Sequence, residues 1–509
     1  MLFPMKLLVK TLAVLLCLLA MVVVLVWTSG PAMNVPWKSM LQQMSLLPAW
    51  LDPTPMTAGQ VEGRLSAPEG YAVSLFATGI ADARMLRVTS RGDVLVSTPR
   101  DGQVLLLEAD RNSDGMSDGQ RVLIDNLTRP NGIDLWENYL YVAEEDGIGR
   151  IPFDVESGTV GGPYQRIVDE LPRGGNHWKK TIRFGPDGLL YVAVGSSCNV
   201  CLEEDERRGA ILRYSPDGEF LGVFAKGLRN SAGFDWAPAS GVLYATDNGR
   251  DLLGDDFPPC ELNEVVEGGF YGWPFVNGRN VLDPDFGPEN QSVADVSIGP
   301  VHEFSAHNAP LGIVFLRYQR APSEFRETAI VALHGSWNRS KKDGYKVVSL
   351  HFSSDGSVEQ RDFLTGFLVN DIAIGRPAEV AEGPDGSIYV SDDFASAVYR
   401  VSLGEYRELS VPSTDNRRSV GYDPTTVSVE ERNTALENGP SVLALEGCLT
   451  CHGDSEEADT AQVVLTDLKM RYTINEMVDF LTDPRPPMPP YDADVEKRRE
   501  LAIHLLETY

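Results

Sequence analysis

The five residues Cys448-Leu449-Thr450-Cys451-His452 have the types and spacing of a covalent haem attachment site. Two thiols at this spacing add across the haem vinyl groups, and the histidine that follows is placed to ligate the iron from one face. A zinc site is the alternative, but zinc needs further cysteine or histidine ligands nearby. After His452 the chain has one more histidine, His504, and no cysteine. The motif therefore predicts a redox protein that carries a c-type haem.

The second axial ligand of this haem is predicted in the proline-rich segment 484–491, which contains Met488. A thioether ligand raises the haem potential, which suits an acceptor of electrons from an organic donor. Met470 and His504 are the alternatives, but both lie on apolar helical faces and are expected in the core.

The region from about residue 433 to 509 resembles a small class I cytochrome c domain. Asn438-Gly439-Pro440 is expected to lead into a helix that carries the cysteine motif, and a helix from about Asp494 is expected to close the chain. Covalent haem would supply the apolar centre that a domain of this size needs.

The N-terminal residues indicate the cellular compartment of the protein. Lys6 and Lys10 precede an apolar run, and residues 7–27 as a helix would reach across a bilayer. An uncleaved signal anchor is predicted, with cleavage near Ser29 to Ala32 as the alternative. The flanking lysines place the remainder of the chain on the periplasmic side, where haem attachment also occurs.

The chain has 44 basic and 73 acidic residues and a net charge of −29, which makes nucleic acid an improbable partner.

Three cysteines lie outside the haem motif and the apolar segment: Cys198, Cys201 and Cys260. Cys198 and Cys201 can close a tight disulfide, as suits an oxidising compartment, with Cys260 free or paired with one of them instead. The loop from Asp110 to Asp118 resembles the start of a calcium loop but lacks its final glutamate, so an ordinary hairpin loop is favoured.

A short pattern recurs through the middle of the chain: a turn with Gly or Asp, a hydrophobic strand, then small or acidic residues. Four-stranded propeller blades need about 40 to 50 residues each, and successive copies lie roughly 45 to 60 residues apart except for one gap of about 87. The sequence predicts an all-β six-bladed propeller with a long insertion between about Asp251 and Phe325. The copies are 92–97, 138–143, 186–193, 241–246, 328–333 and 384–391.

Propellers place their chemistry at one end of the central channel, where loops from every blade converge. Polar residues that lie far apart in the sequence can therefore form one site. The candidates in turn-rich segments are His177, Arg229, Asn230, His307, His334, Trp337, Arg339 and Arg376.

Several segments are similar to the pyrroloquinoline quinone (PQQ)-dependent soluble glucose and sorbosone dehydrogenase family. The segments are Gly174-Gly-Asn-His177, Gly227-Leu-Arg-Asn230, Asp247-Asn-Gly-Arg250, Gly268-Gly-Phe-Tyr-Gly-Trp-Pro274, His334-Gly-Ser-Trp-Asn-Arg339 and Gly375-Arg-Pro377. The resemblance covers nearly the whole propeller, and sorbosone-type members also carry a cytochrome domain behind it.

The resemblance implies roles for individual residues. His177 matches the base that takes the proton of the substrate hydroxyl, and an imidazole with an unperturbed pKa near ~6.5 suits that task. Arg229 matches the arginine that stabilises negative charge on the quinone oxygen.

The resemblance implies that the remaining matched residues bind the cofactors. PQQ would be contacted by Asn230, His307, His334, Trp337, Arg339 and Arg376, and a calcium ion would be held by the backbone carbonyls of Gly249 and Arg250.

Departures from the family pattern concern the substrate. The glucose enzymes have a carboxylate that orients the catalytic histidine, whereas the matching site here is Gly195-Ser196-Ser197. A second cationic contact is replaced by Ala378, and His334 stands where a lysine is usual. These changes favour a sorbosone-like or broad aldose branch over glucose itself.

The sequence thus predicts an enzyme that oxidises a sugar at PQQ and passes electrons through haem to a cytochrome, cupredoxin or quinone. The alternatives are a calcium-dependent lactonase and a non-catalytic sensory or electron-transfer propeller. The predicted domains are 1–30 signal, 31–63 linker, 64–405 propeller, 406–432 linker and 433–509 cytochrome c.

Overall fold

The computed structural model describes residues 58–403 apart from 318–324, 326–327 and 354, and then 422, 424–445, 452–453, 463–464, 468–482, 491 and 493–508. The chain divides into two compact units, Met1–Tyr406 and Arg407–Tyr509. None of the helices formed by the described residues is long and apolar enough to cross a membrane. The predicted anchor 7–27 lies outside the described residues.

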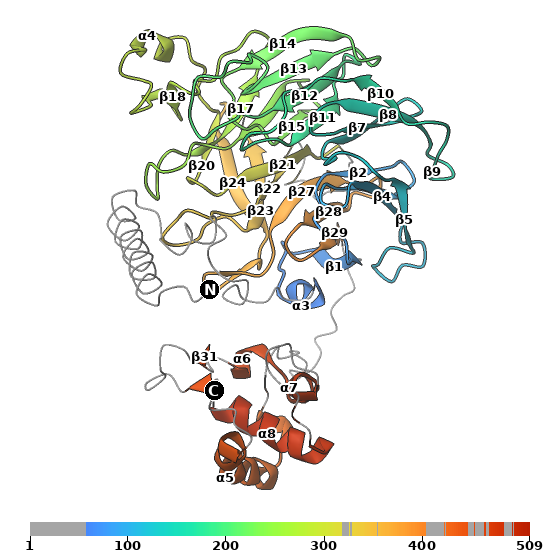
Figure 1. Cartoon of the computed structure of the whole chain (residues 1–509), viewed down its shortest axis with the longest axis vertical. Helices are drawn as coiled ribbons and strands as arrows, with labels where there is room; N and C mark the ends of the chain where they lie inside the picture. Colours follow the sequence, from blue (N-terminus) through green and yellow to red (C-terminus); the bar gives the residue numbers. More distant parts are fainter. Residues whose placement is uncertain are drawn as a thin grey trace, which may run out of the picture. The chain divides into compact units, whose positions relative to one another are not determined.

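The first unit contains six antiparallel sheets, five with four strands and one with a fifth short strand, which are the blades of a propeller (Figure 1). The first strands of successive blades contact one another and line the centre: β2 with β6, β6 with β11, β11 with β15, β15 with β21, β21 with β27, and β27 with β2. In the last blade, β1 at the start of the unit pairs with β29 at its end, and this pairing closes the ring. The predicted six-bladed propeller is confirmed.

The blades follow one another along the chain. The first three are β2 (Leu86–Val88), β3 (Val94–Thr98), β4 (Gln103–Leu107), β5 (Gln120–Ile124); β6 (Ile133–Trp136), β7 (Tyr139–Ala143), β8 (Ile148–Asp154), β10 (Gln165–Val168), with β9 (Thr159–Val160) beside β8; and β11 (Lys180–Phe184), β12 (Leu190–Val194), β13 (Ala210–Tyr214), β14 (Phe220–Lys226). The other three are β15 (Gly233–Trp236), β16 (Leu243–Asp247), β17 (Cys260–Val265), β20 (His302–Phe304); β21 (Pro310–Phe315), β22 (Ala329–Leu333), β23 (Lys346–Phe352), β24 (Val358–Leu364); and β27 (Pro377–Glu382), β28 (Ile388–Asp392), β29 (Ala397–Leu403), β1 (Tyr71–Thr78).

Each of the six repeated sequence segments forms the second strand of its blade. These strands are buried on both faces between neighbouring blades, so their sequences are continuous apolar runs rather than alternating patterns. The turns before two of them place Gly188 and Gly386 at φ of 76° and 81°, which glycine adopts without strain.

The predicted insertion between Asp251 and Phe325 is wrong in extent, because β17, β20 and β21 all lie within it. The inserted segment is 266–301, which contains β18 (Val276–Asn277), β19 (Val281–Leu282) and α4 (Gln291–Ala294). The repeated apolar pattern did not predict strand β17, because this strand buries polar side chains. Asn263 donates to Glu261 at 2.9 Å, and both are buried. Two small elements complete the unit, α3 (Ala58–Glu62) and the hairpin β25 (Leu368–Val369) with β26 (Ile372–Ala373).

The second unit is mostly helical where the structure describes it. It contains η3 (Pro424–Thr426), α5 (Val429–Leu445), β30 (His452–Gly453), β31 (Val463–Val464), α6 (Leu468–Arg471), α7 (Ile474–Thr482) and α8 (Val495–Thr508). Helices α5, α6 and α7 all contact α8, and their apolar side chains form one core.

Helix α5 begins earlier than the sequence suggested. Ser428 and Glu431 form a capping box: the Glu431 N–H donates to the Ser428 hydroxyl at 3.2 Å, and the Ser428 N–H donates to the Glu431 carboxylate at 3.0 Å. The segment 438–440 therefore lies within the helix instead of leading into it. Gly439 leaves the space that the buried His504 ring of α8 occupies, since a Cβ there would lie 2.0 Å from that ring.

Candidate active site

The predicted site residues of the propeller lie at one end of the channel. His177, Arg229, His307 and Arg376 precede the first strands β11, β15, β21 and β27, and His334 follows the second strand β22. Because the first strands stand side by side around the centre, the loops that enter them converge. The fold thus brings together side chains that are up to 199 residues apart in the sequence.

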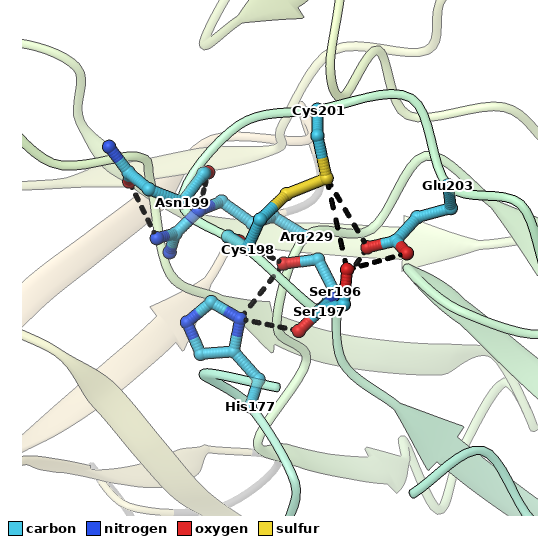
Figure 2. The surroundings of a disulfide bond; sticks show 8 residues. All are labelled: His177, Ser196, Ser197, Cys198, Asn199, Cys201, Glu203 and Arg229. Atoms are coloured by element: carbon cyan, nitrogen blue, oxygen red, sulfur yellow. Dashed lines mark hydrogen bonds between the residues drawn. A yellow bond between two sulfur atoms is a disulfide. The ribbon is translucent and has the colours of Figure 1, made fainter. Parts of the chain in front are cut away.

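His177 is held by the segment that follows β12. Its Nδ1 atom lies 2.8 Å from the Ser196 hydroxyl oxygen and 3.1 Å from the Ser196 carbonyl oxygen (Figure 2). A carbonyl can only accept a hydrogen bond, and the Ser196 hydroxyl donates its own proton to the Cys198 carbonyl at 2.8 Å. His177 Nδ1 must therefore carry the proton, and Nε2 carries the lone pair that a general base needs.

Two glycines allow this close approach. Gly195 faces His177 and Asn230, and a Cβ at that position would lie 2.5 Å from the His177 Cβ and 2.9 Å from the Asn230 side-chain oxygen. Gly175 adopts a φ of 81° and packs against Ser197. A larger residue at either position would push the histidine away from the strand end.

The environment of His177 favours its neutral form. Burial lowers the pKa of His177 to about 3, and the positive charge of Arg229 contributes to the same shift. The pKa of His177 in the structure is therefore lower than the ordinary imidazole value expected from the sequence. At neutral pH the base form of His177 is fully populated, although it is a weaker base than a free imidazole.

Arg229 is buried, and all of its N–H groups have protein acceptors. Nε and Nη2 donate to the Asn199 backbone and side-chain oxygens at 2.8 and 2.9 Å, and Nη2 also meets Asp251 at 3.3 Å. Nη1 donates to the carbonyls of Asn248 and Gly249 at 3.1 and 3.0 Å. In this arrangement Arg229 acts on the site through its positive charge.

Asp247 at the end of β16 supports the arginine turn. Its carboxylate oxygens accept from the backbone N–H groups of Arg229 and Asn230 at 2.9 and 2.6 Å. Burial raises the pKa of Asp247 to about 7.

A second charged cluster surrounds His334. Its Nε2 atom lies 2.9 Å from the Asp393 carboxylate, which also pairs with Arg84 at 2.5 Å. Burial, followed by the Arg376 charge, lowers the pKa of His334 to about 4, so a neutral ring donates to an ionised Asp393. Arg376 donates to the carbonyls of His334 and Gly335 at 3.2 and 3.0 Å.

Sequence reasoning missed Lys179, Arg84 and Asp393. The pKa of Lys179 falls to about 7, first because of the Arg84 charge and then because of burial. Trp178 stands beside Lys179, with the Lys179 Nζ atom 4.9 Å from the indole centroid, and the Arg129 guanidinium stacks on the same indole at 3.6 Å. The adjacent Trp-Lys-Lys residues after His177 were the available signal.

His307 and Arg339 each form hydrogen bonds to residues of other loops. His307 Nε2 donates to the Gly254 carbonyl at 2.7 Å, and its Nδ1 accepts from the Asn338 amide at 3.1 Å. Arg339 donates to the Ala306 carbonyl and pairs with Asp256 at 3.0 Å. Trp337, between them in sequence, is half-buried.

The two backbone carbonyls predicted to bind calcium belong to Gly249 and Arg250, and both residues already have partners within the protein. The Gly249 carbonyl already accepts from Arg229, and the side chain of Arg250 pairs with Asp283 at 2.7 Å. In the Asp110 loop, Arg400 pairs with the Asp110 carboxylate at 2.9 Å, as suits a structural hairpin.

A cavity of about 500 Å³ lies at the opposite end of the channel. Its charges pair with one another: Arg87 with Asp134 at 3.0 Å, and Arg183 and Arg317 with Asp235 at 3.2 and 2.7 Å. These groups form an internal network away from His177.

The haem residues Cys448, Cys451 and Met488 lie outside the described residues. The backbone of His452 lies in β30. Within the described residues, Cys198 and Cys201 form a disulfide and Cys260 is a buried free cysteine. One group of potential metal ligands occurs there, Cys198, Cys201 and Glu203, but its two thiols are consumed by the disulfide.

Comparisons with known proteins agree with this fold. Residues 143–400 match the family model described as Glucose / Sorbosone dehydrogenase. An uncharacterized protein of Borreliella burgdorferi is 31% identical over 363 residues, which cover 68% of this chain and 93% of the relative. The chain belongs to the glucose/sorbosone dehydrogenase family. The predicted family and the assignment to the oxidoreductases are confirmed.

One further sequence relative and one solved structure have names that state an activity. The aldose sugar dehydrogenase YliI of Escherichia coli is 23% identical over 376 residues, covering 68% of this chain and 92% of that protein. The holo form of the pyranose dehydrogenase PQQ domain from Coprinopsis cinerea superposes with a TM-score of 0.57 at 20% identity, covering 69% of this chain and 98% of that domain. The structural likeness shows a common propeller fold.

Proposed function

We propose that this glucose/sorbosone dehydrogenase family member oxidises an aldose or sorbosone-like sugar at PQQ. The observation that carries the proposal is the neutral His177, whose Nδ1 proton is held by Ser196 and whose Nε2 is left as a base at the channel end. Family membership and the names of the E. coli and C. cinerea proteins support the substrate class and the cofactor.

The channel end suits an anionic cofactor. Arg84, Lys179, Arg229 and Arg376 gather positive charge there, which contributes to the lowered pKa values of Lys179, His177 and His334, although Asp393 pairs with Arg84 and Asp251 with Arg229. PQQ carries three carboxylates, which would pair with Lys179, Arg84 and Arg376, and Asn230, His334 and Trp337 would be further contacts of the cofactor. When bound, the quinone supplies the acceptor for two electrons from the sugar.

The chain's own residues then perform the proton chemistry. His177 Nε2 takes the proton of the substrate hydroxyl as the C–H bond gives up its electron pair, and the Nδ1 hydrogen bonds to Ser196 stabilise the imidazolium that results. The fixed charge of Arg229 would stabilise negative charge on a quinone bound beside it.

Calcium is part of the proposal. The carbonyls of Gly249 and Arg250 offer the hard oxygen ligands that calcium prefers, and Arg229 would share the Gly249 carbonyl with the ion. The ion would polarise the quinone.

We further propose that electrons leave singly through a haem attached at Cys448 and Cys451, with His452 and Met488 as axial ligands, to an external cytochrome, cupredoxin or quinone. The motif and the helical second unit support this cytochrome c assignment. The apolar segment 7–27 supports an anchor in the inner membrane, with both units on the periplasmic side.

The test is reconstitution of the full chain with PQQ and calcium chloride, followed by addition of aldoses and measurement of haem absorbance. Sugar-dependent haem reduction that requires PQQ is expected. Sugar oxidation with an artificial dye but without haem reduction would reject the electron path alone. Absence of both, or PQQ-independent lactone hydrolysis in the same preparation, would contradict the dehydrogenase assignment.

A further inference from the structure

The loop that follows β12 is closed on itself by the Cys198–Cys201 disulfide, which links residues only three positions apart (Figure 2). The loop contacts two side chains of the candidate active site that come from different blades. His177 precedes β11, and Arg229 precedes β15.

The first contact runs through Ser196. Its hydroxyl donates to the Cys198 carbonyl at 2.8 Å, so its oxygen is oriented to accept from His177 Nδ1, also at 2.8 Å. Ser196 is fully buried, and water has no access with which to replace this chain of hydrogen bonds. The position of the Cys198 carbonyl therefore sets the orientation of the imidazole.

The second contact runs through Asn199. Its backbone oxygen and its side-chain oxygen accept from Arg229 at 2.8 and 2.9 Å. The side chain of Asn199 is itself fixed on both ends: its oxygen accepts from the Asp251 N–H at 2.8 Å, and its amide donates to the Asp251 carbonyl at 3.1 Å. Asn199 lies inside the disulfide ring, so the ring conformation sets the direction of its backbone oxygen toward Arg229, and Asp251 holds its side-chain oxygen.

We propose that the disulfide-closed loop 198–201 positions His177 and Arg229 together, and that Ser196 with the Cys198 carbonyl replaces a carboxylate as the group that orients the catalytic base. This inference rests on the proposed function for the catalytic roles of His177 and Arg229. Ser196, Asn199 and the two cysteines are positioning residues, because they act through the histidine and the arginine.

The disulfide suits this local task. A crosslink between residues three positions apart restricts the unfolded chain less than one that closes a long loop, so its main effect is on the conformation of the ring itself. The neighbouring Ser197 does not contact His177: its hydroxyl donates to Glu203 at 2.8 Å and lies 3.8 Å from the Cys201 Sγ atom. Ser196 and Ser197 thus form a matched pair, of which one hydroxyl contacts the catalytic histidine and the other does not.

The first test compares Ser196→Ala with Ser197→Ala. In Ser196→Ala, kcat for sugar should fall by about tenfold with little change in KM, since a base misplaced by about 1 Å can cost up to ~100-fold. The nitrogen NMR signals of His177, identified by their loss in His177→Gln, should show less of the Nδ1-protonated tautomer. Ser197→Ala should match the parent protein in both measurements.

The second test removes the disulfide in Cys198→Ser/Cys201→Ser. The double variant should lose at least as much kcat as Ser196→Ala and should also bind PQQ more weakly, because Arg229 loses its orientation through Asn199. Adding Ser196→Ala to the double variant should lower kcat by less than it does in the parent, because both changes break one chain of contacts. Melting temperatures identify any variant that has simply unfolded.

The outcomes separate the two proposals. A parent protein that neither binds PQQ nor oxidises sugar would overturn the proposed function, whereas the His177 tautomer measurement still tests the orientation by Ser196. An unchanged His177 signal and unchanged kcat in Ser196→Ala, or fully additive effects of the serine and cysteine changes, would overturn the positioning proposal even in an active dehydrogenase.

Discussion

The Nδ1 atom of His177 lies 2.8 Å from the hydroxyl oxygen of Ser196, and this contact determines which ring nitrogen is basic. Because the Ser196 hydroxyl proton is directed to the Cys198 carbonyl, the histidine must donate from Nδ1. Ser196 and the Cys198 carbonyl thereby orient the His177 ring, a role for which the sequence analysis had identified no group. The following expectations depend on this geometry and on the charges around it.

Replacement of the base should stop turnover without removing the cofactor. His177→Gln should lower kcat/KM by about 10²- to 10⁴-fold, the usual contribution of a general base. PQQ affinity should change by less than about threefold, because the cations that would bind its carboxylates remain. Stopped-flow haem reduction and fluorescence titration with PQQ measure the two effects. Parent-like turnover in the variant would remove His177 from the mechanism.

The protonation of His177 should respond to the cofactor. Without PQQ, its pKa of about 3 keeps the ring neutral across the physiological range. Three added carboxylates place negative charge nearby, so the pKa should rise on binding. NMR titration of the imidazole signals with and without PQQ measures both values. A cofactor-free pKa near the ordinary ~6.5 would contradict the buried, positively charged setting.

Affinity for PQQ should depend on the charge of Lys179. Its pKa of about 7 in the free protein should rise when a carboxylate binds, so PQQ binding takes up a proton and weakens as the pH rises above about 7. Lys179→Met should weaken binding by roughly tenfold at pH 6. Lys179→Arg, which stays charged, should bind without this pH dependence and is the matched control. Titrations over a range of pH decide the point, and equal pH profiles for lysine and arginine would count against it.

Glu261 should make the protein less stable at alkaline pH. Burial, followed by the Asp247 charge, raises the pKa of Glu261 to about 8. The folded state therefore keeps a proton that the unfolded state has lost above pH ~4.5, and stability falls as the pH rises toward 8 at up to about 1.4 kcal/mol per pH unit. Glu261→Gln cannot ionise and should show a shallower decline. Denaturant unfolding between pH 6 and 9 compares the two, and parallel curves would show that Glu261 is ionised in the fold.

The haem ligand can be identified by paired substitutions of methionine. Met488→Ala should alter the reduced spectrum and lower the haem potential, because loss of a thioether ligand removes its stabilisation of the reduced iron. Met470→Ala is the control and should leave both unchanged. Visible spectra and redox titration are the measurements. The reverse pattern would transfer the ligand role to Met470.

Much of the fold could be predicted because the second strand of each blade is buried on both faces and appears in the sequence as a continuous apolar run. Strand β17 could not, since it buries the polar side chains of Glu261 and Asn263, which hydrogen-bond to each other only in the folded blade. In the second unit, the helix starting near Asp494 matches α8, whereas the capping box at Ser428 and Glu431 moved the start of α5 ahead of the predicted position.

The sequence by itself determined the six-bladed architecture, the family, and the positions of His177, Arg229, His334 and Arg376 on loops of different blades, because turn residues and apolar runs are local signals. The tertiary structure alone decided what those side chains do. Ser196 and Cys198 select the His177 tautomer, Asn199 and the carbonyls of Asn248 and Gly249 occupy the donors of Arg229, and Arg84 lowers the pKa of Lys179. Each of these effects depends on distances between loops, within one blade for His177 and Ser196 and between blades for Arg229 and Lys179, which no local pattern in the sequence specifies.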